Sequence, residues 1–363
     1  MKAKAPLSVR GDTPLEVFVE GDALYDAMLD DIGRAERSVR LESYMLTSDA
    51  VGHTFIGALS RCAARGVSVR LRADYAGTWR ELKGGDIDRL RTAGVRFEWS
   101  RAWSPLRPFA LNRRNHRKLL VVDEAAAFVG GFNIHAASSE RAVGRLRWRD
   151  THVRFIGELA AAAAMVFDRY HDVQPDWLPP KTGSRWLLPN RSKACRHRLR
   201  CELHDALRSA KSRVWATTPY FVPDSSTQKL LCHAAQNEAD VRLLVPGKSD
   251  VPLAQWAARA AYAWLLACGV RIYEYTPRVL HAKTLLVDAN WATVGTANLD
   301  YRSLFVNDEL NLIDEGGGLN SVLARIFLDD LRESEEVLAM QWSQRPWPRR
   351  VAEAIGWGAR RWL

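Results

Sequence analysis

Residues 116–123 read HRKLLVVD, and residues 281–288 read HAKTLLVD. Each octapeptide holds a histidine, a lysine two places later and a final aspartate, with apolar residues filling the gap. GGFN (130–133) follows the first copy and GTAN (295–298) the second, at the spacing of a return strand in a hairpin. Because the same order of residues recurs with the same followers, the chain is predicted to consist of two related halves.

The segments that precede the two octapeptides match as well. Residues 23–45 and 199–221 each read as an amphipathic helix, a polar turn and a strand. Residues 57–77 and 229–250 each read as a helix that leads into an apolar strand. Helices alternating with short apolar strands are typical of α/β layers in which helices cover the sheets. We therefore predict an α/β fold made of two pseudo-symmetric halves.

The connection between the halves is expected in the proline-containing stretch 171–193, which breaks both the helical and the strand periodicity. On this basis we predict an N-terminal half over 1–178, which carries the first octapeptide, and a C-terminal half over 179–340, which carries the second. Residues 341–363 form a basic, tryptophan-rich tail with an amphipathic pattern.

The charge balance favours an anionic partner. The chain has 52 Lys and Arg residues against 42 Asp and Glu residues, which gives a formal net charge of +10. Nucleic acid and an acidic membrane surface both fit such an excess, and charge alone does not choose between them.

Cysteine usage and hydropathy restrict the class of protein further. The five cysteines include no CxxC pair, which argues against a disulfide framework and a cysteine-based zinc site and suits a reducing compartment. The N-terminus lacks the apolar core of a signal peptide, and no apolar run reaches the ~18 residues of a spanning helix. A membrane, if it is the partner, is therefore expected to be met from the side.

The octapeptides supply groups suited to an anionic centre. Alternate side chains of a β-strand share a face, so the histidine and lysine of each copy are expected to point the same way. If the halves pack face to face, two imidazoles, two ammonium groups and two amides converge, from His116, His281, Lys118, Lys283, Asn133 and Asn298. The small residues of GGFN and GTAN are expected to let the backbone approach a ligand closely.

A phosphodiester fits this set of groups. One imidazole would attack phosphorus while the other protonates the leaving oxygen, and the lysines and asparagines would stabilise the charge on the phosphoryl oxygens. This scheme requires no metal ion and no cofactor. A nucleophilic imidazole usually needs a carboxylate on its other nitrogen. Asp150 and Glu309 are the candidates, but the sequence does not show which serves which histidine, and a surface salt bridge is an equal alternative for each.

The complete pattern, H-x-K, four residues, D, six residues, G-[GT]-x-N, present twice, resembles the phospholipase D superfamily. Other stretches resemble its cardiolipin synthase branch, namely LESYMLTSDAVG (41–52), WRDTHVRFIG (148–157), TTPYFVPD (217–224) and NLDYRSLFVNDELNL (298–312). The likeness covers most of residues 15–340. It implies two phospholipase D-like α/β/α sandwich halves with the active site at their interface.

The resemblance also implies an activity. The chain would be a phosphatidyltransferase that moves a phosphatidyl group from phosphatidylglycerol to a second phospholipid or alcohol through a phosphohistidine. His116 would be the nucleophile and His281 the general acid and base. The partner would be an anionic phospholipid at the cytoplasmic face of the cell membrane, bound peripherally, with nucleic acid less favoured. The chain resembles the shorter kind of synthase that lacks two N-terminal membrane-spanning helices.

The candidate catalytic set is the six motif residues, His116, Lys118, Asp123, His281, Lys283 and Asp288. Within it, the two aspartates end their strands and are expected to support them without touching substrate. Asn133 and Asn298 are the candidate phosphate-binding residues. Two other functions stay open: a phosphodiesterase of the same superfamily that hydrolyses phospholipid or nucleic acid, and a membrane-binding module without catalysis.

Two basic stretches are candidates for membrane docking. Residues 101–117 mix arginines with Trp103 and Phe109 directly before the first octapeptide. Residues 347–363 combine an apolar helical face with flanking arginines, as interfacial helices do. For this second stretch, packing of the apolar face onto the domain core is an equal alternative.

Overall fold

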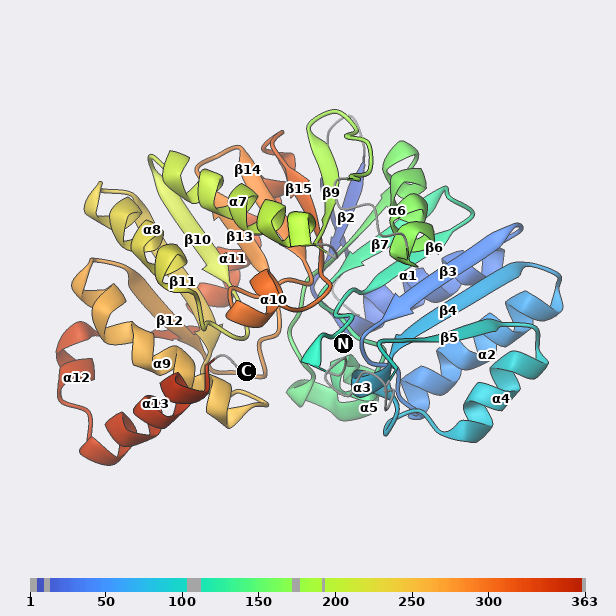
Figure 1. The fold of residues 1–363 in the computed structure, drawn as a ribbon, viewed down its shortest axis with the longest axis horizontal. Helices are drawn as coiled ribbons and strands as arrows, with labels where there is room; N and C mark the ends of the chain where they lie inside the picture. Colours follow the sequence, from blue (N-terminus) through green and yellow to red (C-terminus); the bar gives the residue numbers. More distant parts are fainter. Residues whose placement is uncertain (1–4, 10–13, 103–111, 172–176, 191–192, 361–363) are drawn as a thin grey trace.

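The computed structural model describes residues 5–9, 14–102, 112–171, 177–190 and 193–360. Two mixed eight-stranded sheets form the framework (Figure 1). The first sheet has the strands β1 (Leu7–Val9), β2 (Leu15–Phe18), β8 (His152–Ile156), β7 (Ala126–Gly130), β6 (Leu119–Val122), β3 (Ser38–Ser43), β4 (Ser68–Asp74) and β5 (Arg96–Ser100), in this spatial order. The second has β16 (Ser334–Glu336), β12 (Arg271–Tyr275), β11 (Asp240–Pro246), β10 (Arg213–Thr217), β13 (Thr284–Val287), β14 (Trp291–Gly295), β15 (Leu310–Asp314) and β9 (Arg185–Pro189).

The two sheets repeat one topology. The order β2-β8-β7-β6-β3-β4-β5 of the first corresponds strand by strand to β9-β15-β14-β13-β10-β11-β12 of the second. In each sheet the last three strands are parallel and the others antiparallel. The predicted α/β fold with two pseudo-symmetric halves is therefore confirmed. The boundary predicted at 178 lies between the last strand of the first sheet and the first strand of the second.

Helices cover both faces of the sheets. The helices of eight or more residues are α1 (Gly21–Arg34), α2 (Ala50–Ala64), α4 (Gly84–Thr92), α6 (Glu158–Asp168), α7 (Lys193–Ser209), α8 (Ser225–Gln236), α9 (Pro252–Ala267), α11 (Gly318–Arg332) and α13 (Trp347–Ala359). The short ones are α3 (Tyr75–Thr78), α5 (Glu140–Val143), α10 (Tyr301–Phe305) and α12 (Ala339–Ser343). One apolar core lies under α1 and α2, another under α7, α8 and α9, and a third joins the inner strands of both sheets with α6 and α11. This shared third core fixes the halves against each other.

The octapeptides occupy central strands. All four residues of β6, LLVV, are buried, as are Leu285, Leu286 and Val287 of β13. An interior strand covered by helices on both faces needs such a continuous apolar run, whereas the edge-ward β3 alternates in its first half. The apolar filler of each octapeptide therefore anchors the strand that follows its histidine and lysine.

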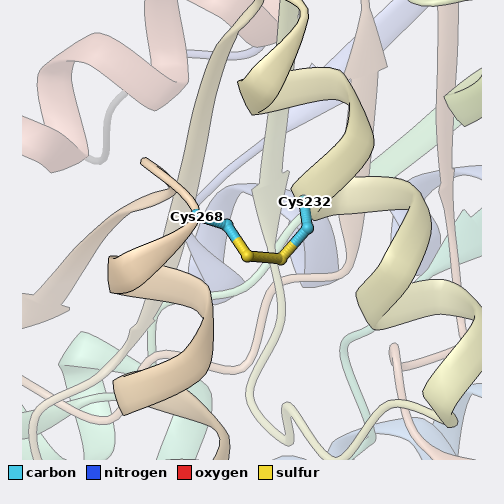
Figure 2. The surroundings of a disulfide bond; sticks show 2 residues. All are labelled: Cys232 and Cys268. Atoms are coloured by element: carbon cyan, nitrogen blue, oxygen red, sulfur yellow. A yellow bond between two sulfur atoms is a disulfide. The ribbon is translucent and has the colours of Figure 1, made fainter.

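One disulfide departs from the sequence-based expectation. Cys232 in α8 is bonded to Cys268 at the end of α9, with their Cα atoms 5.2 Å apart (Figure 2). The cysteine spacing argued against a disulfide framework and did not reveal this single bond, because the residues are 36 positions apart and meet only where α8 and α9 pack side by side. Cys62 is a free, buried thiol and Cys201 a free, exposed one.

The C-terminal tail folds back onto the second half. Helix α13 packs along α9 so closely that a Cβ on Gly356 would lie 2.5 Å from the backbone nitrogen of Ala257. The buried Glu353 pairs with Arg345 at 2.6 Å. Packing on the domain, one of the two alternatives for this tail, is therefore observed for one face of α13. No helix within the described ranges is long and apolar enough to cross a bilayer.

Candidate active site

Each histidine lies in an extended segment that the opposite half holds in place. The His116 backbone N–H donates to the carbonyl of Asp308 at 2.8 Å, and the His281 N–H donates to the carbonyl of Arg149 at 2.7 Å. These segments directly precede β6 and β13, so the prediction that the histidines lie within the strands was wrong by a few residues. The reason is that their backbone groups pair across the interface between the halves and not within a sheet.

The carboxylates pair with the imidazoles in a crossed arrangement. Asp150 Oδ2 lies 2.6 Å from His281 Nδ1, and Glu309 Oε2 lies 3.0 Å from His116 Nδ1. Asp150 is 1% exposed and Glu309 0%, which excludes the surface salt bridge for both. Because Nδ1 of each ring faces a carboxylate, Nδ1 carries the proton and Nε2 is the atom left to face a ligand.

Neighbouring groups orient each carboxylate. Glu309 accepts hydrogen bonds from Thr296 Oγ1 at 2.5 Å and from Ser303 Oγ at 2.9 Å. Asp150 accepts from the backbone N–H of Thr151 at 2.7 Å. A Cβ on Gly131 would lie 2.1 Å from Asp150 Oδ1. The second residue of GGFN, Gly131, therefore leaves room for Asp150, and the second residue of GTAN, Thr296, supplies a hydroxyl to Glu309. This role replaces the expectation that small residues there let the backbone approach a ligand.

The imidazoles are neutral near pH 7. Burial lowers the pKa of His116, although the Glu309 charge acts in the opposite direction. Burial and the Lys283 charge lower the pKa of His281 to about 4. Each ring therefore has a lone pair on Nε2, as a nucleophile or a general base requires.

The two lysines lie beside the histidines as predicted. Lys118 Nζ donates to the His116 carbonyl at 2.8 Å, and Lys283 Nζ donates to the His281 carbonyl. Burial, together with the charge of Lys283, lowers the pKa of Lys118 to about 7. Burial lowers the pKa of Lys283 to about 8. Because the charge of Lys283 acts on Lys118, the two buried ammonium groups favour an anion near both of them.

The asparagines complete the site asymmetrically. Asn133 Oδ1 accepts from the Met45 N–H at 3.3 Å, which leaves its amide N–H groups for a ligand. Asn298 Nδ2 instead donates to Asp300 Oδ2 at 3.0 Å. Asp300 also caps α10 by accepting from the Ser303 N–H at 2.6 Å, and burial raises its pKa to about 6.

A cavity of about 430 Å³ opens between the halves where these groups meet. Both histidines and both asparagines line it. Tyr44 packs edge-on against the His116 ring with centroids 5.0 Å apart, and Trp148 lies 5.3 Å from the His281 ring. Among the described residues, no group of three or more His, Cys, Asp or Glu side chains is arranged to hold a metal ion.

Comparisons with known proteins agree with this geometry. The family described as "Cardiolipin synthase, PLD-like domain" matches residues 28–145 and 203–331, more than half of the chain. The chain belongs to this family. A cardiolipin synthase of Geobacillus thermodenitrificans is 33% identical over 96% of this chain and 72% of its own length. For cardiolipin synthase 1 of Staphylococcus aureus the identity is 31%, over 93% and 71%.

Among solved structures, the phosphatidylserine synthase of Haemophilus influenzae superposes with a TM-score of 0.77. The alignment covers 99% of this chain and 98% of that one, at 12% sequence identity. The likeness therefore concerns the phospholipase D-like fold, with its two related halves, over the full length.

The motif aspartates lie away from the cavity of this phospholipase D-like site. Asp123 follows the end of β6, and seven extended residues place it roughly 20 Å from His116. Its carboxylate accepts from the N–H groups of Arg37 and Ser38, at 2.8 and 2.7 Å. Asp288 does the same for Ser212 at 2.7 Å. Their geometry matches the expectation of strand-end support and gives no reason to include them among groups that touch substrate.

Sequence reasoning did not single out several residues that line the cavity. They are Tyr44, Arg114, Trp148, Tyr220, Asp250, Asp300, Arg302 and Asn307. Tyr44 directly follows β3 and Tyr220 lies shortly after the matching strand β10, so the internal repeat could have shown them. Arg114 and Asp250 have no counterpart in the repeat. The stretch 101–117 lies largely outside the described residues, as do Trp103 and Phe109.

Proposed function

We propose that this protein is a cardiolipin synthase-type phosphatidyltransferase that uses phosphatidylglycerol. The observation that carries the proposal is the pair of neutral imidazoles on one cavity, each with Nδ1 on a buried carboxylate from the opposite half. Two such groups serve a double displacement at phosphorus, because one can bond to phosphorus while the other handles protons.

In the first step, His116 Nε2 attacks the phosphorus of a phosphatidylglycerol. An N–P bond forms and the P–O bond to the headgroup glycerol breaks, and the glycerol oxygen takes a proton from His281 Nε2. The anionic phosphate raises the pKa of the His281 ring beside it, so this proton enters with the substrate. Glu309 stabilises the positive charge that His116 acquires.

In the second step, the hydroxyl of a second phosphatidylglycerol attacks the phosphohistidine. The new P–O bond forms as the N–P bond breaks, and the hydroxyl proton passes to His281 Nε2. Cardiolipin is the product, and His116 is restored. Lys118, Lys283 and the Asn133 amide hold the non-bridging oxygens in both steps and stabilise their charge in the transition state.

We further propose that the protein meets its lipids through a docking face, defined as Trp347, Val351 and Ile355 of α13 with Val143 and Leu146 beside α5. The three α13 residues recur every four positions and so share one face of the helix. Trp347 is 74% exposed, Ile355 57% and Leu146 75%, so the face is apolar and uncovered. Helices α13 and α5 lie along the same edge of the molecule in Figure 1.

Two features support an anionic membrane as the partner of the docking face. Arg145, Arg349 and Arg350 are exposed beside its apolar residues, and basic residues next to apolar ones favour an anionic leaflet by about 1 kcal/mol each. Helix α9, on which α13 packs, begins at the cavity, where Val251 and Ala254 form part of the lining. A lipid headgroup can therefore reach the histidines from a membrane at this face.

The transferase proposal is tested by incubating the purified full chain with phosphatidylglycerol vesicles and identifying the lipids by mass spectrometry. The expected products are cardiolipin and free glycerol in equal amounts. Formation of phosphatidic acid without cardiolipin would instead identify a hydrolase of the same superfamily. Incubation with DNA in parallel tests the nucleic-acid alternative. That alternative requires that the wild-type chain produces DNA fragments and that His116→Ala produces none.

A further inference from the structure

Charged side chains of both signs line the active-site cavity, namely Arg114, Arg302, Asp250 and Asp300. Arg114 and Arg302 line the side next to Tyr44 and His116. Asp250 lines the side next to Tyr220, whose hydroxyl donates to its carboxylate at 2.7 Å, and the Tyr220 ring faces His281. The internal repeat does not explain this difference, because the chemical groups of the two octapeptides are the same. The asymmetry therefore concerns parts of a ligand that lie beyond the reacting phosphate.

The two arginines lie close enough together for the charge of one to act on the other. Burial and the Arg114 charge lower the pKa of Arg302. Arg302 donates to Asn112, at 3.0 Å to its side-chain oxygen and also to its carbonyl. Within the described part of the chain, Arg114 Nη1 is buried and has no hydrogen-bond partner. A buried guanidinium N–H without a partner costs free energy, and two like charges held close together favour an anion beside them.

The reacting phosphate does not account for these arginines. In the proposed mechanism its oxygens are assigned to Lys118, Lys283 and Asn133. Burial raises the pKa of Tyr44, and the charges of Arg114 and Arg302 act in the opposite direction, so both guanidinium groups lie near this tyrosine. Besides the two buried lysines, the site therefore has a pair of arginines that line the cavity itself.

We propose that Arg114 and Arg302 form an acceptor subsite that binds the phosphodiester of the lipid whose hydroxyl attacks the phosphohistidine. This inference rests on the proposed transferase function and specifies its acceptor. A phosphatidylglycerol acceptor carries its own phosphate one glycerol unit away from the attacking hydroxyl. Binding that phosphate at the arginines orients the hydroxyl toward the reacting centre. Water has no phosphate, so the subsite favours transfer over hydrolysis.

The test compares products within one reaction. With phosphatidylglycerol vesicles, Arg114→Gln should lower the ratio of cardiolipin to phosphatidic acid about ten-fold or more, the effect of losing one charge-assisted hydrogen bond. Arg114→Lys, which keeps the charge but not the planar donor geometry, should give an intermediate ratio. The matched control is Arg332→Gln, which removes the same charge from an exposed position on α11. Because the ratio is internal to each reaction, it does not depend on how much of a variant is folded.

A second measurement uses water-soluble acceptors. The wild-type chain should transfer phosphatidyl groups to glycerol phosphate in preference to glycerol, and Arg114→Gln should lose this preference. Inorganic phosphate, which binds the arginines but has no attacking hydroxyl group on a carbon, should inhibit transfer to glycerol phosphate more than transfer to glycerol. An unchanged product ratio and an unchanged preference in Arg114→Gln would overturn the subsite. A wild-type chain that yields only phosphatidic acid would overturn the transferase function itself, and the two failures are thus distinguishable.

Discussion

His116 and Glu309 are 193 residues apart in the chain, yet the Nδ1 atom of one lies 3.0 Å from the Oε2 atom of the other. The reciprocal pair, His281 and Asp150, crosses the interface in the opposite direction at 2.6 Å. Each half thus supplies an imidazole to the cavity and the carboxylate that orients the other imidazole. Neither half holds an oriented histidine without the other.

Substitution of His281 is expected to leave the covalent intermediate on His116 in place while it slows turnover. His281→Ala should slow turnover roughly 10² to 10⁴-fold, because the general acid and base is lost, and phosphohistidine should accumulate on His116. Rapid quenching with labelled phosphatidylglycerol under alkaline conditions, followed by peptide mapping, measures the adduct. His233→Ala, on the exposed side of α8, is the control. Label found on His281 of the wild-type chain would reverse the two roles.

The crossed pairing makes a prediction about the carboxylates. Asp150→Asn should accumulate phosphohistidine as His281→Ala does, because Asp150 orients His281. Glu309→Gln should slow formation of the adduct, again by roughly 10² to 10⁴-fold, because it removes the charge that stabilises His116. Stopped-time labelling separates the two steps, with the exposed Glu315→Gln as control. If Asp150→Asn leaves the second step unchanged, the assignment of Asp150 to the histidine that transfers protons is wrong.

Binding of an anion should weaken as pH rises. The pKa of Lys118 is about 7 and that of Lys283 about 8, so both ammonium groups lose their protons between pH 6.5 and 9. Sulfate keeps its charge in this range and binds more tightly to the protonated lysines. Above the pKa of each lysine, the Kd for sulfate therefore rises by up to about ten-fold per pH unit. Calorimetry should therefore give a Kd at pH 9 at least about ten-fold above that at pH 6.5.

The control for this titration is Lys229→Met in α8, remote from the cavity, which should leave the pH slope unchanged. Lys283→Met should make the slope shallower, because only one titrating ammonium group remains. A Kd independent of pH in the wild-type chain would show that the lysines keep ordinary pKa values.

The docking face is tested by replacing its apolar side chains. Trp347→Asp with Ile355→Asp should lower partitioning onto phosphatidylglycerol vesicles at least about ten-fold, because each buried side chain contributes about 1.5–3 kcal/mol. Co-sedimentation measures the bound fraction. Met165→Asp on α6, a residue 37% exposed away from α13 and α5, is the matched control. Equal partitioning of all variants would mean that another surface meets the lipid.

The disulfide makes a prediction about stability. Cys232→Ser should lower the free energy of unfolding by about 2–4 kcal/mol, because the bond closes a loop of 36 residues in the unfolded chain. Urea unfolding measures the change, and Cys201→Ser, a free and exposed thiol, is the control. Peptide mapping without reductant should show the Cys232–Cys268 pair, and two free thiols at these positions would contradict it.

The sequence by itself determined the duplicated α/β pattern and most of the reactive groups. It did so because strand alternation, hairpin spacing and helical periodicity are local patterns, and each of them occurs once in either half of the chain. His116, Lys118 and Asn133 could be identified with their partners in the second half for that reason. The same local logic identified Asp123 and Asp288 as strand-end residues.

Only the tertiary structure decided which groups meet across the halves. The pairs His116–Glu309 and His281–Asp150 span 193 and 131 residues, and no local pattern encodes such distances. The same limit applied to the Cys232–Cys268 bond and to Arg114 beside Arg302. Each of these contacts is fixed by the shared core of the inner strands with α6 and α11, or by helices packed side by side. Packing of this kind depends on the whole set of buried surfaces, which a reading along the chain does not bring together.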